Sequence, residues 1–341
     1  MLNSTYLLNV NFRWPTDWSG ANLGTALMVV FSVLLVLETA APRDVMPSRR
    51  LRQSYLTNMG LFVANSLAMS FLSSSSLMAL AERHALTGVL SALPSPAGKA
   101  VIALLLLDLL MYLWHVASHR YLCLWMFHRV HHNDRCVNLS TAFRVHILEL
   151  LIIHVLKALL ILALGIEATV LLASEAVMTG FILFHHTNIR FAGEKWLGYI
   201  FIVPAMHRTH HSLQRHEHDS NYGAVLSIWD RLFGTLAKQT AAQLGIKGES
   251  PQHLLGLIQF GCRWPTVVTA PVAVNLEAMI AEAAYYKAEK RGFSPGDDLR
   301  DWLEAKKDIL ALVYGDKGFT VKTAVKPQWG SANHPNQLLH G

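Results

Sequence analysis

Residues 115–132 read HVASHRYLCLWMFHRVHH and contain five histidines. The stretch begins with an HxxxH motif and ends with an HxxHH motif, and a second HxxHH motif, HRTHH, occupies residues 207–211. Histidines spaced i, i+4 lie on one face of a helix, one turn apart. Fourteen of the 18 histidines in the chain fall between residues 115 and 218. This concentration predicts that several helix ends bring imidazoles together at one site.

The residue type indicates metal binding. Imidazole is a ligand for iron, copper, zinc and nickel, and a mononuclear site needs about three or four protein ligands. The motifs supply more histidines than one ion can use, so we expect two metal ions, each held by about four or five neutral imidazoles. Few carboxylates lie among the motifs, which argues against the carboxylate-bridged di-iron site of soluble four-helix bundles. The candidate ligands are His115, His119, His128, His131, His132, His186, His207, His210 and His211, with His185 and His146 as further candidates and His186 favoured over His185.

The composition predicts an integral membrane protein. Apolar residues make up 52% of the chain and charged residues 15%, a balance that excludes disorder and disfavours a purely soluble globule. The net charge of +6 comes without a basic stripe, so nucleic-acid binding is not indicated, and the three scattered cysteines suggest neither a disulfide framework nor a cysteine zinc site. We therefore expect an all-α fold with four to five membrane-spanning helices. The apolar segments are 21–41, 54–80, 99–114, 147–166 and 168–184.

The arginines predict the topology. Arg43, Arg49, Arg50 and Arg52 crowd the loop after the first apolar segment, which the positive-inside rule places in the cytoplasm. Counting the later segments from that loop brings every histidine motif to the same side. A cytoplasmic, histidine-rich metal-binding cap is therefore expected on a multi-pass membrane protein.

The chain divides by composition into three expected parts. Residues 1–100 would hold the N-terminal transmembrane helices, residues 101–262 the di-metal catalytic domain, and residues 263–341 a soluble, cytoplasmic helical tail. Helical spacing of apolar residues predicts one tail helix over 276–291 and a second after the breaker Ser-Pro-Gly at 294–296. We expect the tail to be an accessory module without metal ligands.

Several stretches resemble one known family. They are DLLMYLWH at 108–115, STAFRVHILE at 140–149, HTNIR at 186–190, NYG at 221–223 and IWDRLFGT at 228–235. In the order HxxxH, HxxHH, HxxHH, they are similar to the fatty acid hydroxylase/sterol desaturase superfamily of integral-membrane di-iron enzymes. The likeness runs from about residue 105 to residue 262, with Ile147 where the family usually has proline.

The resemblance implies a reaction and its requirements. It implies two iron ions, which zinc can replace in a purified sample, and O2 as co-substrate for hydroxylating a C–H bond of a lipid. It also implies a separate ferredoxin- or cytochrome-like electron donor and its reductase. A desaturase on the same site is one alternative. A non-catalytic membrane metal-binding or transport protein is another, and a zinc-dependent lipid hydrolase would need a Glu beside the ligands, as in HExxH, which these motifs lack.

Four residues beside the ligands are candidates for the catalytic site: Asp108, Tyr112, Glu149 and Asn221. An aspartate inside a membrane helix is costly and indicates function, so Asp108 is expected to bond a ligand histidine on another helix, and Glu149 to do likewise. Tyr112 is expected to pack, and Asn221 to form a turn that seats the last motif.

The tail carries a second resemblance. Residues 280–305 resemble a short bacterial domain of unknown function, which implies a bacterial source. The expected location is therefore the bacterial inner membrane, with the histidine motifs and the C-terminus in the cytoplasm.

Overall fold

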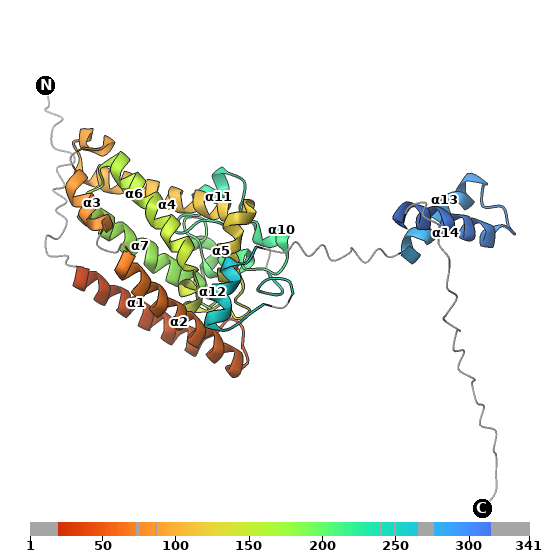
Figure 1. The fold of residues 1–341 in the computed structure, drawn as a ribbon, viewed down its shortest axis with the longest axis horizontal. Helices are drawn as coiled ribbons and strands as arrows, with labels where there is room; N and C mark the ends of the chain where they lie inside the picture. Colours follow the sequence, from red (N-terminus) through yellow and green to blue (C-terminus); the bar gives the residue numbers. More distant parts are fainter. Residues whose placement is uncertain are drawn as a thin grey trace, which may run out of the picture. The chain divides into compact units, whose positions relative to one another are not determined.

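The computed structural model describes residues 20–72, 76–85, 87–238, 241–248, 250–264 and 276–314. The chain separates into two compact units, residues 1–265 and 266–341. The described residues form helices and isolated bridges but no strand, so the all-α prediction is confirmed (Figure 1). The first unit contains α1 Gly20–Ala40, α2 Ser48–Leu72, α3 Ser76–His84, α4 Pro96–Arg120, α5 Leu122–His132, α6 Ile147–Leu164, α7 Ala168–His186, α8 Glu194–Leu197, α9 Pro204–His210, α10 Arg215–His218, α11 Ile228–Leu232 and α12 Leu254–Cys262, with 3-10 turns η1 Val89–Ala92 and η2 Leu139–Phe143.

Four described helices are long and apolar enough to cross a membrane: α1, α4, α6 and α7. The chain is therefore a membrane protein, as its composition predicts. The expectation of one continuous span over 54–80 is wrong, because α2 ends at Leu72 and a separate helix, α3, begins at Ser76. α2 also begins with three arginines, and its buried Asn58 faces polar groups of the protein rather than lipid.

In the core between the spanning helices, small residues allow the helices and loops to approach one another closely. Ala81, Ala100 and Ala103 are buried where α3, α4, α6 and α7 pack together. At the end of α6, Gly165 takes φ +69°, and its backbone meets Gly88 so closely that a Cβ on Gly88 would lie 2.0 Å from Gly165 N. Glycine is required at both positions, since any side chain there would separate the two segments.

A buried carboxylate joins three distant segments at one end of the bundle. Glu38 of α1 accepts hydrogen bonds from Tyr55 Oη at 2.6 Å, Leu139 N at 2.8 Å and Asn188 N at 2.7 Å. Its charge is therefore satisfied inside the protein, as a buried charge must be. Glu38 thereby ties α1 to α2, to η2 and to the residues that follow the histidines of α7.

The arginine-rich loop after α1 lies at the same end of the molecule as the histidine motifs. Arg43 N donates to Asn188 O at 2.7 Å, just beyond the end of α7. Asp44 of this loop forms an ion pair with Arg208 of α9. The loop and the motifs are thus on one side, as the topology argument predicts.

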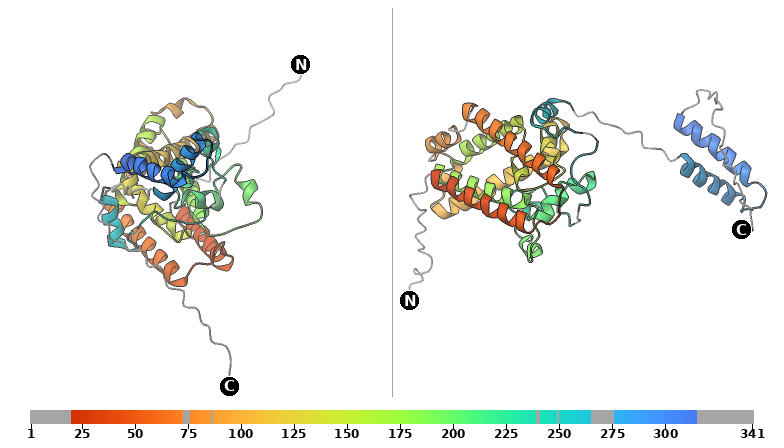
Figure 2. Two further views of the ribbon diagram at one scale, coloured as in Figure 1. Left: turned by 90° about the vertical axis from the view of Figure 1, so that its right-hand side faces the viewer. Right: turned by 90° about the horizontal axis from the view of Figure 1, so that it is seen from below.

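The second unit is a helical hairpin of α13 Leu276–Lys290 and α14 Asp298–Tyr314 (Figure 2). The two predicted tail helices are therefore present, and they pack on each other around buried Ile280 and Ala305. Arg291 closes the hairpin through ion pairs with Asp298 at 3.1 Å and Asp301 at 2.8 Å.

Removal of the tail tests whether it is accessory. A chain ending at Pro271 should keep the metal content of the full-length protein, because every group of possible ligands among the described residues lies within residues 115–219 and the hairpin has its own core. Elemental analysis of both proteins, purified from the membrane, measures this directly. If the shortened protein stayed folded in the membrane but lost metal, His334 or His340 would have to be ligands.

Candidate metal centre

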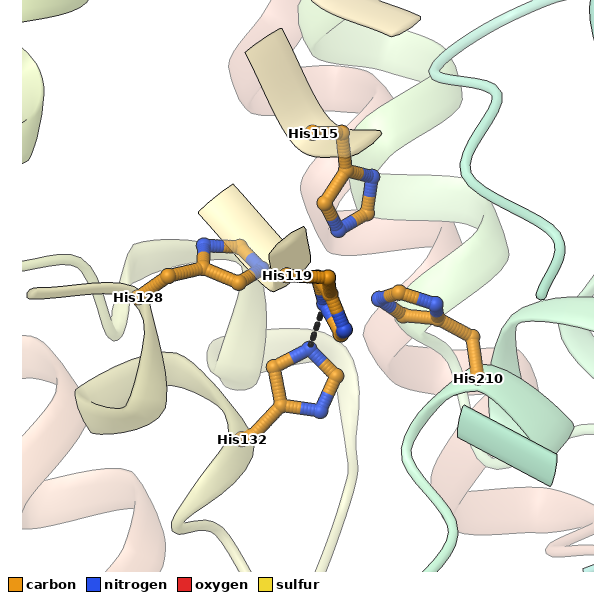
Figure 3. Close-up of side chains that lie close together, drawn as sticks. All are labelled: His115, His119, His128, His132 and His210. Carbon is orange, nitrogen blue, oxygen red and sulfur yellow. Dashed lines mark hydrogen bonds between the residues drawn. The ribbon is translucent and has the colours of Figure 1, made fainter. Parts of the chain in front are cut away.

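The structure gathers nine histidines into two groups. The five-histidine group contains His115, His119, His128, His132 and His210, and the four-histidine group contains His131, His186, His207 and His211. Within each group, one ligand atom from every residue lies within 4.8 Å of the others. Figure 3 shows the five-histidine group, whose rings converge from separate helices on a common centre.

The HxxHH spacing distributes each motif over both groups. On α5, His128 and His132 are spaced i, i+4 and turn to the five-histidine group, whereas His131 turns to the four-histidine group. The second motif, on α9 and its C-cap, does the reverse: His207 and His211 enter the four-histidine group and His210 enters the other. The HxxxH pair at the end of α4 and His186 at the end of α7 complete the two sets.

Backbone carbonyls orient several of these rings. Nδ1 of His115 lies 2.8 Å from Tyr222 O, and Nδ1 of His210 lies 2.7 Å from Ser220 O. A carbonyl oxygen only accepts, so these Nδ1 atoms carry the proton and each neutral ring presents a lone pair at Nε2. Nε2 of both rings is buried without a hydrogen-bond partner. Such unpaired inward atoms are what a metal site requires.

Carboxylates orient two further rings of the five-histidine group. Glu149 Oε1 accepts from Nδ1 of His128 at 2.7 Å, and Asp219 Oδ1 accepts from Nδ1 of His119 at 3.2 Å. Nε2 of His128 is also buried and unpaired. A carboxylate behind a ligand histidine fixes its orientation and raises its basicity.

In the four-histidine group, the Nε2 atoms lie closest to one another. His186 Nε2 is 3.1 Å from His131 Nε2 and 2.9 Å from His207 Nε2, and His211 Nε2 is 3.1 Å from His207 Nε2. Nitrogens that each lie about 2.0–2.1 Å from a single ion would be spaced in this way. His186 Nδ1 donates to Ile182 O at 2.6 Å, which turns its Nε2 inward.

Burial keeps these imidazoles neutral. Removal from water lowers the pKa of five of these histidines well below its usual value, and the neighbouring histidines lower it further. The neutral ring is the form that binds a metal. The donor set, its orientation and its protonation state therefore all fit two metal ions. The pKa values concerned are those of His131, His132, His207, His210 and His211.

The two further candidates lie outside both groups. His146 caps the start of α6 and places Nε2 3.1 Å from Ile258 O, so both of its ring nitrogens have partners outside the two groups. His185 is buried with its ring centroid 4.0 Å from that of His207, but it makes a hydrogen bond with the backbone of Ala224 instead of joining the group. The preference for His186 over His185 agrees with this arrangement.

Asp108 does not contact a histidine, contrary to expectation. Its carboxylate accepts from Val225 N at 2.9 Å, Leu226 N at 3.1 Å and Trp229 Nε1 at 2.9 Å. The reason is that the loop before α11 folds back over α4 and brings its own donors to Asp108. This aspartate therefore fixes the loop whose residue Tyr222 orients His115.

The other three candidates all make hydrogen bonds, and within the described residues only that of Glu149 reaches a histidine ring. Glu149 bonds His128 directly, as expected, and also accepts from Trp114 Nε1 at 3.4 Å. The hydroxyl of Tyr112 is 3.0 Å from Thr235 Oγ1, and its ring stacks on Phe233. Asn221, at φ +54°, bonds Met206 O and both backbone groups of Ala237 and so seats the end of the last motif.

Asp219 was missed from the sequence. Asp219 and His218 lie with His119 in a third cluster of possible ligands. The segment HEHD at 216–219 was an available signal, because it places two histidines and two acids directly after the second HxxHH motif. Asp219 belongs beside the five-histidine group as a partner of His119.

Comparison with known proteins finds one family match within each unit. Residues 100–235 match the model of the fatty acid hydroxylase family, and residues 275–311 match a family described as a protein of unknown function, DUF2934. The first match contains all nine histidines of the two groups. No solved structure is significantly similar to the chain.

Curated relatives are lipid-acting enzymes by name. The chain is 31% identical over 162 residues to the ornithine lipid hydroxylase of Rhizobium tropici, covering 47% of this chain and 49% of that protein. It is 34% identical to the alkylglycerol monooxygenases of Danio rerio and Homo sapiens, over 41% and 39% of this chain and 30% and 29% of theirs. The chain thus spans half or less of the length of these relatives.

The two groups predict separable metal losses. His210→Ala should remove the ion of the five-histidine group, and His131→Ala should remove that of the four-histidine group, because each residue serves only one group. Each variant should retain about one of two ions per chain in elemental analysis. His216→Ala, at an exposed position, is the control and should retain both. Two ions in either ligand variant would contradict the assignment.

Glu149 provides a test of ring orientation. Glu149→Leu removes the acceptor of His128 Nδ1, so the affinity of the five-histidine group for metal should fall about 10–100-fold. Glu149→Gln keeps an acceptor oxygen and should recover most of the affinity. Competition with a chelator measures both. Equal affinity of the Leu variant and the unmodified protein would show that the hydrogen bond does not position the ligand.

Proposed function

Because residues 100–235 match the model of the fatty acid hydroxylase family, we propose that this chain is a membrane-bound di-iron enzyme that hydroxylates a C–H bond of a lipid. The observation that carries the proposal is the pair of adjoining, buried, all-histidine groups at the ends of spanning helices. The names of its relatives, which are a lipid hydroxylase and monooxygenases, support the reaction class.

The proposed roles follow from the two groups. His115, His119, His128, His132 and His210 would hold one iron, and His131, His186, His207 and His211 the other. Bound iron would supply the redox chemistry that activates O2 toward an unactivated C–H bond. The balanced reaction converts R–H, O2, two electrons and two protons into R–OH and water.

The protein's own contribution is enclosure and orientation. Each hydrogen bond from Nδ1–H described above turns the unprotonated Nε2 of its ring toward the centre, so that Nε2 offers a lone pair there. The four-histidine group is fully buried, so water is excluded around it. Glu149 and Asp219 place negative charge behind His128 and His119 and so stabilise the positive charge of a bound metal.

Electrons would come from outside the chain. The sequence contains no Gly-rich nucleotide-binding loop and no haem-attachment motif. A separate ferredoxin- or cytochrome-like carrier with its reductase would therefore deliver them at the histidine-bearing end. The arginine-rich loop at that end supports a cytoplasmic location for it by the positive-inside rule, and the proposed membrane is a bacterial inner membrane.

Two alternatives differ in testable ways. A desaturase on the same site would remove two hydrogens from the lipid and form two waters from O2. A metal transporter would need ligands along its membrane helices, whereas both histidine groups lie at helix ends. The hydroxylase is favoured because the named relatives are hydroxylases and monooxygenases.

Labelled oxygen tests the reaction. The iron-loaded protein, supplied with a ferredoxin, its reductase and lipid extract from a host lacking the gene, should add one ¹⁸O atom from ¹⁸O2 to a lipid. Mass spectrometry of the extract measures this, with His210→Ala as the inactive control. Loss of two hydrogens without label would identify a desaturase. No change in any lipid, despite two bound irons and reduced donor, would refute the proposal.

A further inference from the structure

An apolar groove lies among α1, α4 and α7. Its volume is about 670 Å³, and Ser174 is the one polar side chain among its 17 described lining residues. Small residues make room for it, including Ala100 and Gly180, and a Cβ placed on Gly180 would meet no atom within 4 Å. The groove therefore has the size of a ligand site and lacks the polar partners that would hold water.

The groove runs along α7 toward the histidines. Its lining extends from Val170 to Phe184 on this helix, a rise of about 21 Å at 1.5 Å per residue. This exceeds half of the roughly 30 Å hydrocarbon thickness of a bilayer, so a lipid chain from one leaflet fits. At the inner end, Phe184 lies two residues before His186, and the ring of Phe181 stacks on Phe201 at 4.7 Å.

Residues 194–201 separate this groove from a charged pocket. Leu197 and Phe201 line the groove, whereas Lys195 and Tyr199 line a pocket of about 410 Å³. Trp196 is 73% exposed and Tyr199 is 53% exposed on the same segment. Aromatic residues exposed at the end of spanning helices are typical of the membrane–water interface. The segment thus lies where lipid headgroups are found.

The pocket is cationic. Lys195, Arg231 and Lys238 line it and are exposed, while its one acid, Glu194, is engaged by Ala205 N at 2.7 Å and by Arg43 at 4.0 Å. Met206, directly before His207 of the four-histidine group, forms part of its wall. Groove and pocket are therefore each lined by a residue that is close in sequence to a histidine of that group, Phe184 to His186 and Met206 to His207.

We propose that one bilayer lipid binds across both cavities, with an alkyl chain in the α1–α4–α7 groove and an anionic headgroup against Lys195, Arg231 and Lys238. At this depth in the membrane, lipid chains are the apolar molecules available to fill the groove. The headgroup stays at the interface, on the side of the histidines, because the groove offers it no polar partner. The chain then points away from the centre.

This placement defines where the lipid reacts, a consequence that rests on the proposed function. Since both histidine groups lie at the headgroup end of the groove, the carbon presented to them is one near the headgroup. Hydroxylation is therefore expected close to the headgroup, with R–H, O2, two electrons and two protons giving R–OH and water. The carrier described above supplies the electrons.

Binding is measured on metal-free protein, so that it does not depend on catalysis. A phosphatidic acid with a diazirine near its chain end, in phosphatidylcholine nanodiscs, should label α7 and α1 at the groove. Gly180→Trp fills the groove and should reduce this labelling about tenfold. Leu159→Trp, on the exposed face of α6, is the control and should not. Equal labelling of both variants would overturn the groove site.

A second experiment tests the headgroup site by removing positive charge from the pocket. The double variant Lys195→Ala/Lys238→Ala should weaken labelling by phosphatidic acid about tenfold and leave labelling by the corresponding diacylglycerol unchanged. Lys247→Ala, outside the pocket, is the control. Competition by inorganic phosphate would assign the pocket to a soluble anion and overturn the combined site, as would an equal effect of the double variant on both lipids.

Location of the hydroxyl group completes the test. On the iron-loaded protein, fragmentation mass spectrometry should place the new oxygen near the headgroup of the product. An oxygen near the chain end would overturn the inferred orientation. Labelling as predicted without any oxidation, at full iron content, would leave the lipid site intact and refute the proposed hydroxylase.

Discussion

The centre depends on one constraint, which is that acceptors around it hold the Nδ1 protons of five of its nine rings outward. His115 and His210 donate to the carbonyls of Tyr222 and Ser220, and His186 donates to that of Ile182. Each bond fixes both the tautomer and the rotation of a ring, so that Nε2 faces inward. Without these acceptors, buried neutral imidazoles would bond one another and offer no common point to a metal. The acceptors therefore determine the centre as much as the histidines do.

The polar interior of the protein holds those acceptors in place. Asp230 accepts from Tyr222 N at 2.8 Å and so sets the carbonyl that His115 uses. On the other side, buried Arg144 donates to Val130 O, between His128 and His131, and pairs with Asp134 at 3.9 Å. Burial of such charges is costly unless they are paired and hydrogen-bonded, and here each has several partners. The cost is tolerated because it positions the ligand-bearing helices.

How much of this the sequence could predict depends on the distance between interacting residues. The nine histidines could be named because i, i+4 spacing defines a helix face within a few residues. The prediction that Asp108 bonds a histidine was wrong. Its partner Val225 lies 117 residues away, in a loop that no local sequence pattern positions. The role of Glu38 was also missed, since a charge at a helix end usually reaches water. The carbonyl acceptors could not be predicted from residue types, because every residue has a backbone carbonyl.

The bonds of Asp108 impose an order on assembly. This carboxylate sits within α4, yet its three donors all come from residues 225–229, more than a hundred residues later in synthesis. The spanning helices are thus made first, and α4 carries an unsatisfied acid until that loop arrives. The same loop carries Tyr222 and Ser220, whose carbonyls accept from His115 and His210. Completion of the five-histidine group therefore depends on a loop that is synthesised after all four spanning helices.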